Sequence, residues 1–137
     1  MSRTVLLANP IGFCGGARRA FQLFQELAKR APGKPIYVLR ELVHNRAVTD
    51  AMKRDGAVFV EDIGQVPEGS TLLLGAHGTG PKTRKLCQDR HLEIHDAVCP
   101  VVAKLHDTAK TIDQSTPVIL LGDKDHTEIR QLLEWLS

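Results

Sequence analysis

Residues 11–20 read Ile11-Gly-Phe-Cys-Gly-Gly-Ala-Arg-Arg-Ala20 and place a cysteine where a predicted strand gives way to a predicted helix. Upstream, the apolar run Val5-Leu-Leu-Ala8 ends at Asn9-Pro10, which predicts a buried strand stopped by a turn. Downstream, apolar residues recur at intervals of three and four and predict one buried helix face: Ala17, Ala20, Phe21, Phe24, Leu27 and Ala28. Cys14 is therefore expected at a helix N-terminus, where unpaired backbone N–H groups and the helix dipole favour a thiolate. The alternative interpretation is a small buried residue at a strand-to-helix turn.

The composition and charge of the chain argue against a nucleic-acid-binding protein and against a membrane protein. The chain has 137 residues, 42% of them hydrophobic, which is enough to bury a core. Its net charge is only +2 and 4% of its residues are aromatic, and no basic block stands out, so we expect no nucleic-acid partner. No apolar run approaches the roughly eighteen residues that a membrane helix needs, and no apolar leader precedes the first strand, so we expect a cytoplasmic protein. Three cysteines without a secretion signal indicate a metal or redox role rather than disulfide bonds.

The rest of the chain alternates between predicted strands and helices. Strands are expected at residues 36–39, 57–60, 70–74, 92–98 and 117–121, and helices at residues 46–55, from Pro81, from Pro100 and over residues 127–137. This rhythm predicts an α/β fold, with a mostly parallel sheet and helices on both faces. The amphipathic run at 127–137 is expected to be a closing helix that ends the protein.

Ligands of parallel sheets bind outside the carboxyl ends of the strands. Five candidate residues follow directly after a predicted strand and are expected to converge at one edge of the sheet: Cys14, His44, His77, Cys99 and His126. Cys87 lies late in the helix that Pro81 opens, so we expect it to pack near the opposite edge. His91 is expected to be solvated, and His95 and His106 to be core or surface histidines rather than ligands.

Two cysteines and three histidines at one edge of a sheet allow a metal site. Thiolates favour iron-sulfur clusters or zinc, and the paired Cys-x-x-Cys spacing typical of zinc is missing here. Cys14 and Cys99 lie on separate turns, which suits a cluster held from several loops. The histidines could donate hydrogen bonds to an anionic ligand, and Glu128 could supply a proton.

Six short motifs resemble those of 4-hydroxy-3-methylbut-2-enyl diphosphate reductase, the IspH or LytB family, and they occur in the same order. They are Ala8-Asn-Pro-x-Gly-Phe-Cys14-x-Gly, Glu41-x-Val-His44-Asn45, Ala76-His77-Gly78, Asp96-Ala-x-Cys99-Pro100, Lys104-x-His106 and His126-x-Glu128. The resemblance spans nearly the whole chain but only the N-terminal part of the family protein. It implies an IspH/LytB-like N-terminal α/β domain over residues 1–137, with residues 1–99 as the first family domain and residues 100–137 as a helix-strand-helix continuation.

The resemblance also implies roles for individual residues. Those enzymes reductively remove a hydroxyl from an allylic diphosphate in isoprenoid biosynthesis, with an oxygen-sensitive iron-sulfur cluster, here expected to be [4Fe-4S]. Cys14 and Cys99 resemble two of the three cluster-binding cysteines, and Glu128 resembles the acid of the proton relay. His44, His77 and His126 match the histidines that hold the diphosphate and hydroxyl of the substrate, and His126 is also a candidate catalytic residue.

The third family cysteine comes from a later domain, which this chain lacks. We therefore expect a homo-oligomer or a partner chain to supply the missing ligands, and an external electron donor to reduce the cluster. Two other interpretations remain open. One is a binding module without a cluster that holds a phosphorylated metabolite through its histidines. The other is thiol or sulfur chemistry at a low-pKa Cys14.

Overall fold

A four-stranded parallel sheet forms the centre of the computed structural model, which describes residues 3–9, 11–43, 45–113 and 115–137. Its strands are β1 (Ile36–Leu39), β2 (Ala57–Val60), β3 (Thr71–Leu74) and β4 (Glu93–Asp96), in the order β2-β1-β3-β4. Leu72 of β3 is in register with Tyr37 of β1 and Ile94 of β4. All pairs are parallel, so every strand ends at the same edge of the sheet.

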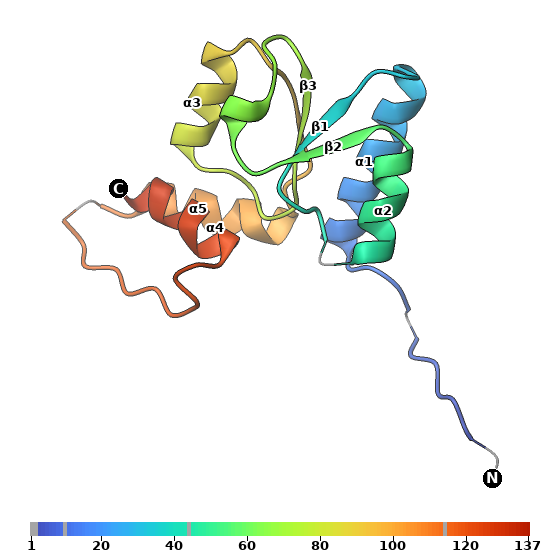
Figure 1. The fold of residues 1–137 in the computed structure, drawn as a ribbon. Helices are drawn as coiled ribbons and strands as arrows, with labels where there is room; N and C mark the ends of the chain where they lie inside the picture. Colours follow the sequence, from blue (N-terminus) through green and yellow to red (C-terminus); the bar gives the residue numbers. More distant parts are fainter. Residues whose placement is uncertain (1–2, 10, 44, 114) are drawn as a thin grey trace.

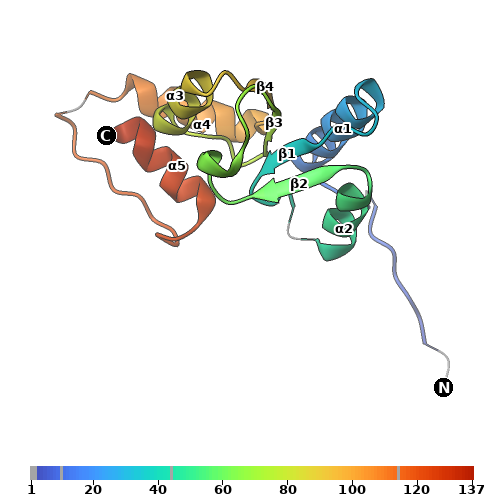
Figure 2. The same ribbon diagram turned by 45° about the horizontal axis from the view of Figure 1, so that its top comes forward.

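Helices cover both faces of this sheet, as the sequence predicts. On one face lie α1 (Gly15–Arg30) and α2 (Arg46–Arg54), and on the other lie α3 (Pro81–Asp89) and the short 3₁₀ helix η1 (Ile63–Gln65). The last two helices, α4 (Pro100–Thr111) and α5 (Thr127–Leu136), pack against each other beside α3 (Figures 1 and 2). None of the helices in the described ranges is long and apolar enough to cross a membrane.

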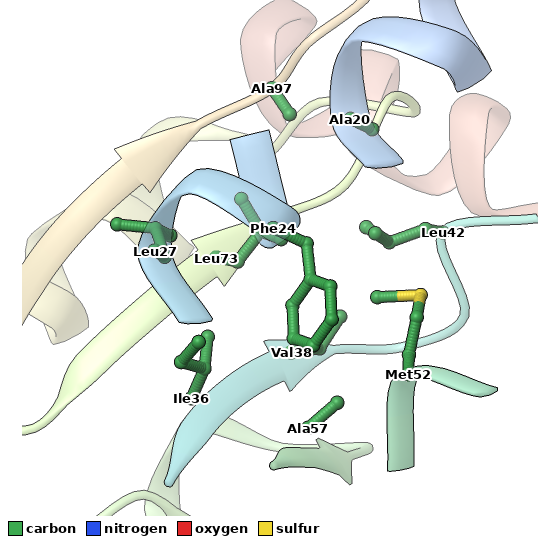
Figure 3. Close-up of a cluster of buried hydrophobic side chains, with 10 residues drawn as sticks. All are labelled: Ala20, Phe24, Leu27, Ile36, Val38, Leu42, Met52, Ala57, Leu73 and Ala97. Atoms are coloured by element: carbon green, nitrogen blue, oxygen red, sulfur yellow. The ribbon is translucent and has the colours of Figure 1, made fainter. Parts of the chain in front are cut away.

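The core consists of two apolar clusters, one on each face of the sheet. Figure 3 shows the first, in which Phe24 of α1 points toward Val38 of β1, with Met52 of α2 beside it. Alternation along the strands divides the side chains between the clusters, because Leu73 belongs to the first and its neighbours Leu72 and Leu74 to the second. Cys87 is fully buried in the second cluster, and its predicted packing role is confirmed.

Two of the six predicted strands are wrong. Residues 5–8 and 117–121 form no strand, and Leu6 and Leu121 are 90% and 92% exposed. An apolar run predicts that a segment is buried, but a strand also needs a neighbouring strand to accept its backbone hydrogen bonds. The described part of the chain offers neither segment such a neighbour. The division of the chain at residue 99 stays a prediction.

Candidate active site

Three of the predicted site residues occupy the position immediately before the first residue of a helix. Cys14 precedes α1, and its Sγ accepts a hydrogen bond from the N–H of Ala17 at 3.5 Å. Cys99 precedes α4, whose first residue is Pro100. His126 precedes α5, and its Nδ1 accepts from the N–H of Glu128 at 3.3 Å. The positive end of a helix dipole therefore lies at each of these side chains and favours an anion there. The predicted helix N-terminal position of Cys14 is confirmed.

Cys99 connects the first turn of α1 with the loop after β3. Its N–H donates to the carbonyl of Ala76 at 3.0 Å, directly beside His77. Its side chain lies against Gly16, where an added Cβ would be 2.9 Å from the Cβ and 3.0 Å from the Sγ of Cys99. Since Gly16 is only two residues beyond Cys14, both cysteines lie at the same end of α1. Glycine at position 16 is what allows Cys99 to approach this helix so closely.

The loop after β3 brings His77 to the start of α5. Nδ1 of His77 lies 3.0 Å from Oε1 of Glu128, and both side chains are partly accessible to solvent. The rings of His77 and His126 meet edge to face, with centroids 5.9 Å apart. The structure thus brings together three of the predicted residues, although their roles stay predictions. His44, the remaining predicted histidine, lies outside the described residues.

Polar side chains on one face of α5, which the sequence analysis missed, hydrogen-bond to the backbone around the start of α3 and so hold α5 against it. Oε1 of Gln131 accepts the N–H of Gly80 at 2.5 Å, and the glutamine is 2% exposed. Oε2 of Glu134 accepts the N–H groups of Lys82 and Thr83 at 3.2 and 3.4 Å, at the start of α3. Glu128, Gln131 and Glu134 recur every three residues and so share one helix face. This regular spacing of three polar residues along one side of an amphipathic helix is the signal that could have identified them.

Another missed feature is the contact between the loop and α4. Gly78 has a φ of +73°, and an added Cβ would lie 2.5 Å from Cε1 of His106. His106 is only 4% exposed, so of the two expected positions, core or surface, it occupies the core. Burial lowers the pKa of its imidazole, and the nearby charges of Lys110 and Arg84 lower it further. His106 therefore acts as a neutral packing group that supports the loop carrying His77.

The described residues hold too few ligands for a complete metal site. They include no group of three or more His, Cys, Asp or Glu side chains placed to hold a metal ion. The third thiol, that of Cys87, is buried, and burial raises its pKa. The remaining donors, Cys14 and Cys99, fit one part of a thiolate site, because each lies immediately before a helix whose N-terminus carries a partial positive charge.

Thiols and histidines at the carboxyl edge of a parallel sheet, beside helix N-termini, are an arrangement typical of the ligand sites of α/β proteins. The family model described as "LytB protein" matches residues 5–137. The chain therefore belongs to the LytB family.

Relatives of known name agree with this membership. The chain is 43% identical over 126 residues to a 4-hydroxy-3-methylbut-2-enyl diphosphate reductase of Haemophilus influenzae, covering 91% of this chain and 40% of that protein. A Neisseria meningitidis protein of the same name is 42% identical over 136 residues, covering 98% and 42%. The solved E-1-hydroxy-2-methyl-but-2-enyl-4-diphosphate reductase of Plasmodium falciparum superposes with a TM-score of 0.86 at 36% identity, over 93% of this chain and 40% of that one. The chain thus spans less than half the length of these relatives.

Proposed function

We propose that this chain forms the N-terminal part of a 4-hydroxy-3-methylbut-2-enyl diphosphate reductase of isoprenoid biosynthesis. The observation that carries the proposal is the pairing of His77 with Glu128 beside His126, at the edge of the sheet where Cys99 lies. Membership of the LytB family and relatives with that name support the same reaction. In it, a carbon–oxygen bond of an allylic alcohol breaks, two electrons and two protons are consumed, and the hydroxyl leaves as water.

Different side chains of the site would bind the substrate and supply the proton in this reaction. Ring N–H groups of His77 and His126, and of the predicted His44, would bind the diphosphate and hydroxyl oxygens. Glu128, 3.0 Å from His77, is placed to pass a proton to the leaving hydroxyl. The N-termini of the helices after Cys14, Cys99 and His126 favour the charge of the diphosphate.

The cofactor of the proposed enzyme is an iron-sulfur cluster, with Cys14 and Cys99 as ligands. A [4Fe-4S] cluster would supply the electrons, and an external donor would reduce it. Two thiolates are fewer than the three cluster-binding cysteines that the family resemblance implies, so we propose that a second copy or a partner chain supplies the remaining ligand. Free thiols at the site suit a reducing compartment, and we infer a cytoplasmic location.

The test is anaerobic purification followed by reconstitution with iron and sulfide, with iron per chain, charge-transfer absorbance and assembly mass measured together. We expect about four irons per cluster and fewer clusters than chains, because the thiolates are shared between chains. Cys14→Ser and Cys99→Ser should lose the colour, whereas the matched variant Cys87→Ala should keep it. Protein without iron or colour in the assembled state would contradict the proposal.

A second function is favoured by the three helix N-termini and the histidine pair. The same residues could bind a phosphorylated metabolite without a cluster. In that case iron-free protein should bind inorganic diphosphate in calorimetry, and His77→Ala should weaken that binding at least about tenfold. Diphosphate binding that appears only after reconstitution would instead support the reductase.

A further inference from the structure

A cleft lies at the edge of the sheet where strands β1 and β2 begin, opposite to the edge that carries the candidate site. Its volume is about 670 Å³, and it is lined by residues within the ranges 25–35 and 53–58. Helices α1 and α2 both end on this side of the molecule (Figure 1), and we call the hollow the amino-edge cleft. Pockets that bind small molecules usually have volumes of about 300–1,000 Å³, so this cleft has the size of a metabolite site.

The walls of the amino-edge cleft come from two backbone turns that are fixed to each other. The N–H of Ile36 donates to the carbonyl of Gly56 at 3.0 Å, and an added Cβ at Gly56 would lie 3.5 Å from the carbonyl oxygen of Lys34. Pro32 and Pro35 restrict the φ angles of the first turn. The cleft is therefore formed by the fold itself, so a ligand would not have to pay for ordering these turns.

Positive charge surrounds the amino-edge cleft. Four of the side chains that line it are basic and one is acidic, namely Lys29, Lys34, Lys53, Arg54 and Asp55. Among the residues that the structure describes, no carboxylate forms an ion pair with any of the four basic groups. These cations are therefore available to an anion from solution.

The helix dipoles account for only part of this charge. Lys29 stands in the last turn of α1, and Lys53 and Arg54 stand in the last turn of α2. Each helix C-terminus carries roughly half a unit of negative charge, so three cations exceed what the two helix ends balance. Lys34 belongs to no helix and still lines the same cleft. The surplus of positive charge favours a ligand group with two or more negative charges.

Apolar surface lies in the same cleft as these cations. Ala28, Pro32, Pro35 and Val58 are part of its lining. Val58 is 40% exposed although it belongs to strand β2, which forms one edge of the sheet. A ligand that covered this surface would gain from the removal of apolar area from water. The lining thus suits a molecule that combines an anionic group with an apolar body.

We propose that the amino-edge cleft binds a soluble metabolite in which a phosphate or diphosphate group is attached to a short apolar body. The basic side chains would donate charge-assisted hydrogen bonds to the phosphate oxygens, and the apolar lining would cover the body. Because this cleft and the candidate site lie at opposite edges of the sheet, the proposal does not rest on the proposed function.

An NMR titration of the chain with butyl diphosphate, followed at the backbone amides of Gly33 and Gly56, tests the proposal. Both amides lie in the cleft, so they report on this site and not on the candidate site. We expect both signals to shift with one midpoint, and sulfate to bind at least about tenfold more weakly because it has no apolar body.

Matched variants assign the binding to the lysines of the cleft. Lys34→Gln/Lys53→Gln should weaken the binding of butyl diphosphate at least about tenfold, through the loss of two charge-assisted hydrogen bonds. The control is Lys82→Gln/Lys85→Gln, which removes two charges from α3 and should leave the midpoint unchanged. All four lysine side chains are exposed, so these substitutions should not disturb folding.

Several results would overturn the proposal. They are unshifted signals of Gly33 and Gly56, sulfate that binds as tightly as butyl diphosphate, and equal losses of affinity in the two double variants. Sedimentation of the chain with phosphatidylglycerol vesicles would make a lipid headgroup the ligand instead of a soluble metabolite. We expect the chain to stay in the supernatant.

Discussion

At the scale of single residues, Gly78 couples the loop that carries His77 to helix α4. Its φ of +73° lies in the left-handed region, and the ring of His106 occupies the space where a side chain would begin. Two separate constraints therefore meet at one position. The first is conformational and applies to any side chain, and the second is steric and depends on how far His106 can move.

Gly78→Ala should separate these two constraints when it is compared with Gly33→Ala. Gly33 has a similar φ of +77° but has open space around it. We expect Gly33→Ala to lower the free energy of unfolding by about 1 kcal/mol, and Gly78→Ala to lower it by about 1–3 kcal/mol more through overpacking. Urea denaturation of both variants measures the difference. Equal losses would mean that His106 does not confine the loop.

The burial of His106 predicts a pH dependence. Burial, aided by Lys110 and Arg84, holds the pKa of this imidazole below its usual value in the folded state. Below about pH 6.5 the unfolded chain takes up the proton more readily, so stability should fall as the pH drops through that value. Above it, this group contributes no pH dependence.

An NMR titration of the His106 ring, assigned with the variant His106→Gln, measures the effect directly. We expect a midpoint below pH 6.5, and a weaker acid-side loss of stability in the variant than in the unchanged protein. A midpoint at or above 6.5 would contradict the prediction.

At the scale of helices and strands, α5 joins the site to the start of α3. Glu134 accepts two backbone N–H groups there, and its negative charge faces the positive end of the α3 dipole. Glu134→Ala should therefore cost about 1–2 kcal/mol and speed amide exchange at Lys82 and Thr83. Glu26→Ala, which removes an exposed carboxylate on α1, is the matched control. Unchanged exchange at both amides would show that the contact does not hold the helices together.

Elements whose formation depends on local sequence pattern could be predicted, whereas strands that depend on a neighbouring strand could not. Helix α1 is amphipathic over four turns and the apolar strands β1, β2 and β3 lie between turn residues, so local pattern was enough for them. Residues 5–8 and 117–121 carry equally apolar patterns, and their prediction failed because strand formation depends on a partner. The apolar pattern therefore identified segments suited to a buried strand, but it did not reveal whether the described chain provides a neighbouring strand for each of them.

Part of the candidate site was predictable because its position follows from the order of strands and helices along the chain. Parallel strands end at one edge, so residues directly after strands, such as His77 and Cys99, could be grouped from the sequence alone. The capping contacts of Gln131 and Glu134 depend on how α5 docks against α3, which no local pattern reveals. Likewise, the approach of Cys99 to Gly16 depends on the packing of two helices that are distant in the sequence.

At the scale of the whole molecule, Cys87 reports on global opening, because it is fully buried in the second core cluster and burial raises its pKa. In the variant Cys14→Ser/Cys99→Ser it is the single thiol of the chain. We expect iodoacetamide to label it at least about 10³-fold more slowly than in urea-unfolded chain, since a stability of about 5 kcal/mol keeps the open fraction below that level. The exposed Cys14, in the matched variant Cys87→Ala/Cys99→Ser, should react without such protection.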